Sequence, residues 1–403
     1  MHRLRGVTGA AGALLVLWLG AAISQGADMP TTTATVPEAP LRKDPAEHWS
    51  PDLLAQVPSF RPAGFPDSES AGLQAILYDG VAVGGAAAPV FAYIGMPSTP
   101  PPAGGYPGVV LVHGGGGTAF PAYVKLWTSY GFAVLAMDWY NQRPVITDPT
   151  REGESQLERQ PLPGGRRQDH VANVANMVLA HSLLRSLPQV DATRTALVGL
   201  SWGSWYGAVV AAIDPRFRGV IEIYCGAYDL SRHPIISGVY LHAAKVPMYW
   251  VASTNDQNVT PEGLQRGFDE CATLHNASMV IRLPHSHVGF QFTSCRRVAE
   301  HFLMDRPPLP RLGRSTLADG RISAPVLHEG KGIIRTILCY TTDRDEPVSH
   351  LRQWHDAPAE RDGNTISAAL PPGVFQCFLS AYDEDTRWND CCGSSDLQTL
   401  PRP

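Results

Sequence analysis

One serine in a glycine-flanked pentapeptide is the residue of this chain best suited to covalent chemistry. Residues 199–203 read Gly-Leu-Ser-Trp-Gly and directly follow a short apolar run that begins at Thr195. This G-x-S-x-G pattern is typical of a sharp turn from a strand into a helix, in which the serine is exposed and side chains at the flanking positions would clash. Ser201 is therefore the predicted nucleophile, and we expect a helix to begin just after it.

A serine hydroxyl is a poor nucleophile near neutral pH, so it needs a base, and the base needs a partner. The apolar run Val246–Ser253 leads into a loop that contains Asp256, and a second apolar run that ends at Leu283 leads to two histidines. We predict that His287 is the base because it lies nearer the start of the following helix, with His285 as the alternative. Asp256 would fix the imidazole tautomer and stabilise the imidazolium that forms.

A glycine-rich loop upstream offers the other part of such a site. The apolar run Val109–His113 leads into Gly114–Gly117, which matches the His-Gly-Gly-Gly type of loop whose backbone supplies an oxyanion-hole donor. We expect the backbone N–H groups of Trp202 and Gly115 to hold the oxyanion, and the loss of one such donor typically costs about 3 kcal/mol. Loop, serine, aspartate and histidine follow one another in the order found in α/β-hydrolases.

Several residues beside these loops have two interpretations. Asp138 and Trp139 end an apolar run near the expected site and either line the pocket or, for Asp138, cap the next element. His113 more often shapes such a loop than reacts. Trp202 and Trp205 either form an apolar pocket for an acyl group or a sugar, or belong to the core.

The elements that must position these residues alternate along the chain. Strands are expected at about 73–80 and 90–94 and then at runs that end near 113, 138, 199, 225, 253 and 283; helices are expected at about 120–130, 171–187 and 291–303, and after Ser201. Such alternation predicts a doubly wound, mainly parallel sheet with helices on both faces. We assign this α/β catalytic domain to residues 73–304.

A proline-rich stretch then predicts a boundary, because proline removes helical and ladder hydrogen bonds. We interpret residues 305–324 as a linker and residues 325–403 as a small β-sandwich. Its strands are expected near 333–342, 365–370 and 374–382, where β-rich runs alternate with Pro/Gly turns. This region carries no catalytic constellation of its own.

The first 26 residues have the features of a secretory signal peptide. A basic start with Arg3 and Arg5 is followed by an apolar run of about a dozen residues and by small residues. An uncleaved membrane anchor is the alternative interpretation. The short run argues against it, because a bilayer span needs about 20 residues. We predict a secreted or periplasmic protein, in which residues 27–72 form a linker and an approach to the domain.

Composition excludes some classes of function. The 403 residues are 44% hydrophobic and 17% charged with a formal net charge of −5, which is typical of a globular protein and gives no basic footprint for nucleic acid. No metal motif is present, and neither a cofactor nor a stable membrane partner is expected. Seven cysteines cannot all pair. Cys225 lies in an apolar run, and Cys271 with Cys295 and Cys339 with Cys377 are possible bridges.

With these residues in hand, the chain resembles the acetyl xylan esterase and dienelactone hydrolase-like branch of the α/β-hydrolase superfamily. The resemblance covers about residues 73–303 and is carried by residues 107–120, 179–186, 199–203, 255–256 and 284–287. It implies a serine esterase that acts through an acyl-enzyme on short acyl esters, such as acetyl groups on a polysaccharide. True dienelactone hydrolases use a cysteine nucleophile, so Ser201 argues against that reaction.

Two other functions stay open. A peptidase of the prolyl oligopeptidase type would use the same triad and fold, although the stretch before the first strand is too short for the N-terminal domain of such enzymes. A binding protein on a retained hydrolase fold is the second alternative, and the intact Ser-Asp-His set argues against it. The expected partner is a small-molecule or polysaccharide ester.

Overall fold

The computed structural model describes residues 44–65, 72–83, 86–146, 157–162, 169–224 and 240–402. The expected signal peptide and Cys225 lie outside these residues, as does much of the expected N-terminal approach. Within the described ranges, no helix is both long and apolar enough to cross a bilayer.

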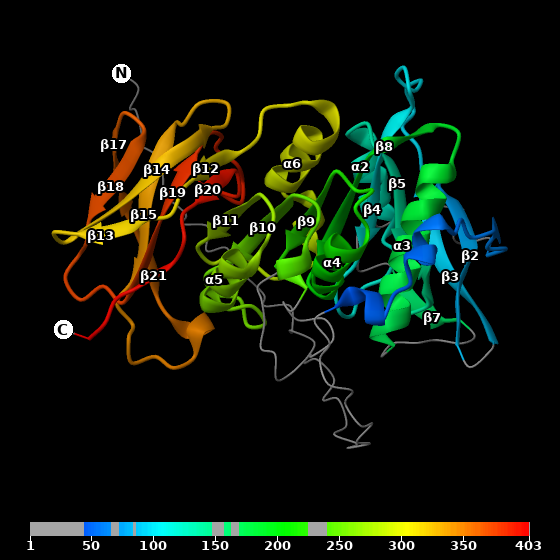
Figure 1. Ribbon diagram of the computed structural model, residues 1–403, viewed down its shortest axis with the longest axis horizontal. Helices are drawn as coiled ribbons and strands as arrows, with labels where there is room; N and C mark the ends of the chain where they lie inside the picture. Colours follow the sequence, from blue (N-terminus) through cyan, green and yellow to red (C-terminus); the bar gives the residue numbers. More distant parts are fainter. Residues whose placement is uncertain are drawn as a thin grey trace, which may run out of the picture. The chain divides into compact units, whose positions relative to one another are not determined.

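A mixed sheet, nine-stranded within the described ranges, carries the fold (Figure 1). In spatial order its strands are β1 (Phe60–Pro62), β2 (Gln74–Val83), β3 (Ala86–Gly95), β5 (Ala133–Met137), β4 (Tyr106–Val112), β8 (Val190–Leu200), β9 (Gly219–Ile223), β10 (Met248–Ser253) and β11 (His275–Val280). Pairing is antiparallel from β1 to β5 and parallel from β5 to β11. A separate antiparallel pair consists of β6 (Gln142–Ile146) and β7 (Leu157–Pro161).

Helices cover both faces of this sheet (Figure 1). They are α2 (Pro121–Ser129), α3 (His170–Ser186), α4 (Trp202–Ile213), α5 (Pro261–Glu270) and α6 (Thr293–Met304), with short 3-10 helices η1 (Pro45–Glu47), η2 (Pro51–Ala55), η4 (Leu241–Ala243) and η5 (His287–Gln291). Alternate residues of a strand point to opposite faces. In β4, Val110 and Val112 therefore pack in the core with α3 and α4, whereas Val109 and Leu111 pack with α2 and α6.

The parallel strands bring the expected chemistry to one edge of the sheet. Because neighbouring parallel strands run the same way, the segments that follow them emerge together at their carboxyl ends. The glycine loop follows β4, Ser201 follows β8, Asp256 follows β10 and His285 follows β11. Residues that are far apart in the sequence thus lie together at this edge of the sheet.

The C-terminal region is a β-sandwich, as predicted. Its strands are β12 (Pro310–Leu312), β13 (Thr316–Ala318), β14 (Arg321–Glu329), β15 (Arg335–Thr341), β16 (Trp354–Pro358), β17 (Glu360–Asp362), β18 (Thr365–Ala369), β19 (Gln376–Tyr382), β20 (Cys392–Ser394) and β21 (Gln398–Thr399), with η6 (Ser349–Leu351) between β15 and β16. All of their pairings are antiparallel. Ile322, Leu338, Ile366 and Leu379 belong to the apolar core that β14 and β18 share with β15 and β19.

The stretch expected to be a linker, residues 305–324, takes part in this sandwich. Helix α6 ends at Met304, and Asp305 adopts a left-handed conformation (φ 54°) that stops it. The chain then enters β12 and β13 and begins β14. Pro310 is tolerated because β12 lies at the edge of its sheet, where a missing N–H breaks no inner ladder.

The sandwich packs directly on the α/β region, and the two belong to one compact unit. Ser278 Oγ of β11 donates to the carbonyl oxygen of Cys392 in β20. The guanidinium of Arg297 in α6, which is 2% exposed, makes a two-pronged ion pair with Asp383 at 2.5 and 2.8 Å. The interface therefore combines strand-edge hydrogen bonds with a buried charge pair.

Candidate active site

Ser201 lies at a strained turn between β8 and α4. Its φ of 53° and ψ of −113° are rare for a residue with a side chain. The Ser201 N–H donates to the carbonyl oxygen of Ile223 at 2.8 Å, which ties the turn to β9. A β-carbon at Gly199 would overlap Gly203, and one at Gly203 would overlap the Val112 carbonyl oxygen. The two glycines are thus required by close backbone packing.

His285 connects the serine to the aspartate. Its Nε2 lies 3.1 Å from Ser201 Oγ, and its Nδ1 lies 2.6 Å from Asp256 Oδ2. Asp256 is 2% exposed, and its Oδ1 accepts from the backbone N–H groups of Asn258 at 2.7 Å and Val259 at 3.2 Å. A carboxylate on Nδ1 holds the proton there, so the Nε2 lone pair faces the serine hydroxyl. This is the geometry of an activated nucleophile.

The prediction of His287 as the base is corrected by this geometry. His287 begins the 3-10 helix η5, which the Ser286 side chain caps, and its ring packs against Phe120 at a centroid distance of 4.7 Å. Its Nε2 lies against Gly117, in the space that a β-carbon would take. Proximity to the helix start was a misleading criterion. His287 is the first residue of the capped helix, whereas His285 remains on the loop before it.

Tyr224 packs against one face of the His285 ring. The sequence analysis did not identify Tyr224 as part of the site. The two rings stack at 4.4 Å with an interplanar angle of 23°, and the Tyr224 hydroxyl donates to the Pro284 carbonyl oxygen at 2.6 Å. Burial raises the pKa of Tyr224 well above its ordinary value, so the phenol stays a neutral donor. Its place just after the buried strand β9 is the one signal in the sequence that could have indicated it.

The glycine loop leaves one backbone donor beside the serine turn. The Gly116 N–H donates to the Tyr140 hydroxyl at 3.2 Å, and the Gly117 N–H donates within the loop at 3.1 Å. The Gly115 N–H has no acceptor among the described residues. Gly115 lies against the indole of Trp202, whose backbone N–H opens helix α4. Gly115 and Trp202, the two residues predicted to supply oxyanion donors, are thus neighbours in space.

Asp138 and Trp139 hold the two ends of the glycine loop through contacts with His113 and Thr118. Asp138 is fully buried, accepts from Thr118 Oγ1 at 2.6 Å, and lies with Oδ1 3.5 Å from His113 Nε2. Trp139 Nε1 donates to the His113 carbonyl oxygen at 2.7 Å. Of the two interpretations of Asp138, a structural one therefore fits, as does a loop-shaping role for His113.

Trp202 belongs to an aromatic cluster at the edge of the site. His170 stacks on it at 5.6 Å with an interplanar angle of 5°, and Trp205 meets it edge-on at 4.8 Å. Tyr206, in the next turn of α4, is fully buried, whereas Trp202 and Trp205 remain partly exposed. The two tryptophans therefore serve both the core and the surface next to Ser201.

The described residues gather no group of three or more His, Cys, Asp or Glu side chains that could hold a metal ion. Six cysteines carry free thiols: Cys271, Cys295, Cys339, Cys377, Cys391 and Cys392. Neither of the possible bridges, Cys271 with Cys295 or Cys339 with Cys377, is present. Burial raises the pKa of each of the six thiols, which keeps them protonated and unreactive.

With the sheet and the Ser201–His285–Asp256 geometry established, comparison with known proteins decides the family. Residues 109–373 match the Alpha/beta hydrolase family. The chain belongs to this family. Membership of the alpha/beta hydrolases confirms the superfamily and the fold expected from the motifs, and it supports a hydrolase.

Solved structures similar to this alpha/beta hydrolase include proteins of the two kinds that the motifs resemble. The acetyl xylan esterase from Paenibacillus sp. R4 is 17% identical, with a TM-score of 0.48, and the match covers 64% of this chain and 94% of that one. Acetyl xylan esterase 1 from Thermoanaerobacterium sp. JW/SL YS485 is 16% identical at the same coverages, with a TM-score of 0.43. A putative dienelactone hydrolase from Klebsiella pneumoniae subsp. pneumoniae MGH 78578 is 16% identical, with a TM-score of 0.38 over 57% of this chain and 94% of its own. No curated protein matches this chain.

Proposed function

We propose that the protein is a serine carboxylic ester hydrolase that works through an acyl-enzyme. The observation that carries the proposal is the continuous hydrogen-bond chain from Ser201 Oγ through His285 to the buried Asp256. A serine, an imidazole and a buried carboxylate in this order are the parts that acyl transfer needs. The adjacent Gly115 and Trp202 supply the expected oxyanion donors.

Acylation follows from this arrangement. Ser201 Oγ attacks the ester carbonyl carbon while His285 Nε2 takes the hydroxyl proton, and Asp256 stabilises the imidazolium. The carbonyl electron pair moves onto oxygen, where the backbone N–H groups of Gly115 and Trp202 stabilise the charge. When the tetrahedral intermediate collapses, the alcohol leaves with the proton from His285, and the acyl group remains on the serine.

Deacylation repeats the sequence with water. His285 takes a proton from a water molecule as its oxygen attacks the acyl carbon, and the same two donors hold the second oxyanion. Collapse returns the proton to Ser201 Oγ and releases the carboxylic acid. No group beyond the three side chains, the two amides and water is required.

We propose short acyl groups, acetyl first, as substrates. The resemblance of residues 107–120 and 199–203 to acetyl xylan esterases supports acetyl, and the partly exposed Trp202 and Trp205 next to the nucleophile offer flat apolar surfaces on which a sugar ring could stack. Acetylated polysaccharide is therefore the alcohol component to examine after simple esters.

We also propose that the protein is exported, from the basic start and apolar run within residues 1–26. Sequencing the N-terminus of protein recovered outside the cytoplasm should give a start close to residue 27. An intact Met1 on all recovered protein would contradict cleavage.

The decisive experiment is hydrolysis of p-nitrophenyl esters from acetyl to octanoyl by the full chain and four variants. Ser201→Ala and His285→Gln should each lower kcat by about 10⁶-fold, and Asp256→Asn by about 10⁴-fold. His287→Gln is the comparison variant: its ring packs on Phe120 and against Gly117 of the glycine loop, so its loss of kcat should be far smaller than that of His285→Gln.

Three outcomes would contradict the proposal. Full activity in Ser201→Ala would remove the nucleophile. A larger loss in His287→Gln than in His285→Gln would restore the other histidine as base. Cleavage of peptide substrates with no ester turnover would favour a peptidase that uses the same triad.

A further inference from the structure

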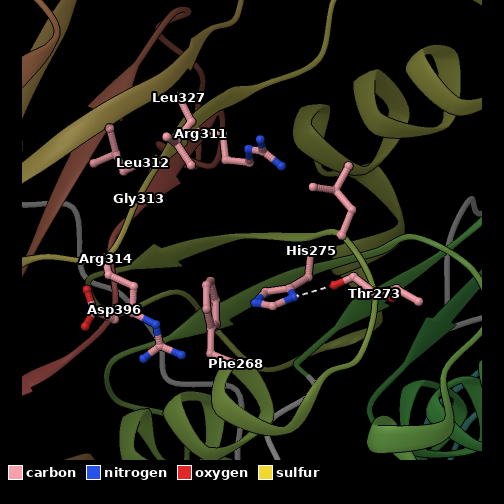
Figure 2. Close-up of a pocket in the computed structure, with 10 residues that line it drawn as sticks. Phe268, Thr273, His275, Arg311, Leu312, Gly313, Arg314, Leu327 and Asp396 are labelled. Atoms are coloured by element: carbon pink, nitrogen blue, oxygen red, sulfur yellow. Dashed lines mark hydrogen bonds between the residues drawn. The ribbon is translucent and has the colours of Figure 1, made fainter.

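A cavity lies where the sandwich meets the sheet (Figure 2). It is lined from β11 and the preceding loop by Leu274 and His275, and from the sandwich by Arg311 and Leu327. His275 begins β11, whereas His285 follows the other end of that strand. A strand of six residues spans about 20 Å. The cavity and the proposed catalytic residues therefore occupy opposite ends of the sheet.

Two adjoining spaces make up this recess. One has a volume of about 280 Å³ and the other of about 240 Å³, and they share Leu274, His275 and Arg311 in their walls. Each is close to the lower limit of about 300 Å³ for ligand pockets. The recess is large enough for a small organic molecule.

The walls are mainly apolar and partly open to solvent. Leu274 is 62% exposed and Leu327 is 52% exposed, and both large aliphatic side chains line the recess. Figure 2 shows the Phe268 ring beside the His275 ring, and the two meet edge-on at a centroid distance of 4.7 Å. An apolar occupant would cover this surface.

Arg311 is the cation of the recess to which no described carboxylate is paired. Its side chain is half-buried and makes no ion pair or hydrogen bond with any described residue, and Figure 2 shows it reaching from its strand into the gap. Arg314, at the rim, is already paired with Asp269 at 2.6 Å. The Asp396 carboxylate accepts from the backbone and side chain of Ser315. Asp396 therefore keeps its negative charge, and Arg311 is the cation of the lining that has no carboxylate partner among the described residues.

His275 adds no second charge. Its Nδ1 lies 2.8 Å from the Thr273 carbonyl oxygen, to which it donates. Burial lowers the pKa of His275, and the neighbouring Arg314 and Arg311 lower it further. The ring is therefore neutral near pH 7 and contributes an aromatic face.

We propose that this recess binds a small amphipathic monocarboxylate, with the carboxylate on the Arg311 guanidinium and the apolar body along Phe268, Leu274 and Leu327. A planar guanidinium matches a carboxylate with two parallel hydrogen bonds. The Arg311 guanidinium among apolar walls fits one negative charge on an apolar body, and the Asp396 carboxylate in the same lining disfavours a multiply charged phosphate. The proposal is independent of ester hydrolysis at Ser201.

The test is calorimetric titration of the full chain with 4-phenylbutyrate and, separately, with the neutral 4-phenylbutanol. The carboxylate should bind saturably at one site, and the alcohol at least tenfold more weakly. Arg311→Gln should weaken carboxylate binding at least tenfold. Arg306→Gln, an exposed arginine outside the recess, is the matched control and should leave binding unchanged.

A second variant tests the apolar wall. Leu274→Ser changes a side chain that is mostly exposed, so the fold should persist, and binding should weaken severalfold. Equal binding to Arg311→Gln and the parent, or no saturable binding, would overturn the proposal. Binding that survives in Arg311→Gln and competes with an ester substrate would place the carboxylate at Ser201 instead. Because calorimetry needs no turnover, failure of the ester assay leaves this test intact.

Discussion

Asn255 lies against Arg352: its side-chain Nδ2 donates to the Arg352 carbonyl oxygen at 2.8 Å and also to that of His350 at 2.9 Å. Asn255 immediately precedes Asp256, the carboxylate that holds His285. Through these two hydrogen bonds the C-terminal sandwich fixes the loop that carries the proposed triad acid. Asn255 is therefore a positioning residue that does not itself touch substrate.

Asn255→Ala should lower kcat about tenfold or more while KM stays the same. Displacement of a catalytic group by about 1 Å can cost on the order of 100-fold, and the substrate is not touched by this amide. Steady-state kinetics with an acetyl ester would measure the split. Asn364→Ala, an exposed amide at a turn of the sandwich, is the control. A rise in KM with unchanged kcat would rule out positioning of Asp256.

Tyr140→Phe should weaken the oxyanion loop without affecting the triad. The variant removes the hydroxyl that accepts from the Gly116 N–H at 3.2 Å, and a backbone donor left unpaired costs about 1–3 kcal/mol. We expect a lower kcat with His285 and Asp256 undisturbed. Tyr130→Phe, a tyrosine at the end of α2, provides the control. Equal kcat in both variants would show that the loop needs no support from Tyr140.

His181 should make the protein sensitive to acid. This histidine is fully buried, with Nδ1 2.8 Å from Asp214 Oδ2 and Nε2 2.8 Å from Thr195 Oγ1. Burial lowers the pKa of His181 to about 4, against the opposing effect of Asp214. The unfolded chain takes up this proton near pH 6.5, so the free energy of unfolding should fall as the pH drops from about 6.5 towards 4.

Urea unfolding at a series of pH values would check this sign. His181→Gln keeps a neutral side chain at the site and should flatten the decline between pH 6.5 and 4, although it lowers stability at pH 7. His355→Gln, an exposed histidine, should leave the slope unchanged. An unaltered slope in His181→Gln would assign the acid sensitivity to other groups.

Arg297→Met should destabilise the whole chain by about 3–5 kcal/mol, because it leaves Asp383 buried without its partner. The double variant Arg297→Met/Asp383→Leu should recover part of that loss, since no charge is then buried. Chemical denaturation of the single and double variants would measure the coupling. A double variant less stable than Arg297→Met alone would show that Asp383 matters mainly through other contacts, such as the Lys331 N–H at 2.8 Å.

The sequence predicted Ser201 and the glycine loop because their requirements are local. The clashes that exclude side chains at Gly199 and Gly203 arise within a few residues or against the neighbouring strand β4. The glycines of the pentapeptide therefore indicate the turn in the sequence alone. Alternating apolar runs likewise predicted the parallel sheet and its helices. The spatial order of β4, β8, β10 and β11 was not predicted and comes from the structure.

The choice between His285 and His287 depended on contacts that are distant in sequence. The ring that supports His285 belongs to Tyr224, which follows a different strand. The hydrogen bonds from Asn255 to the sandwich are equally remote along the chain. The proline-rich stretch was misread for a related reason, because only pairing with β14 reveals that Pro310 begins an edge strand.

The amide of Asn255 also has a consequence for biosynthesis. Its acceptors, the carbonyl oxygens of His350 and Arg352, are made almost a hundred residues after it, beyond the last helix of the α/β region. A nascent chain that has emerged only as far as Met304 therefore holds every proposed catalytic residue but lacks the contacts that fix the acid loop. The site should mature late, so hydrolysis would begin only after the sandwich has been synthesised and has docked.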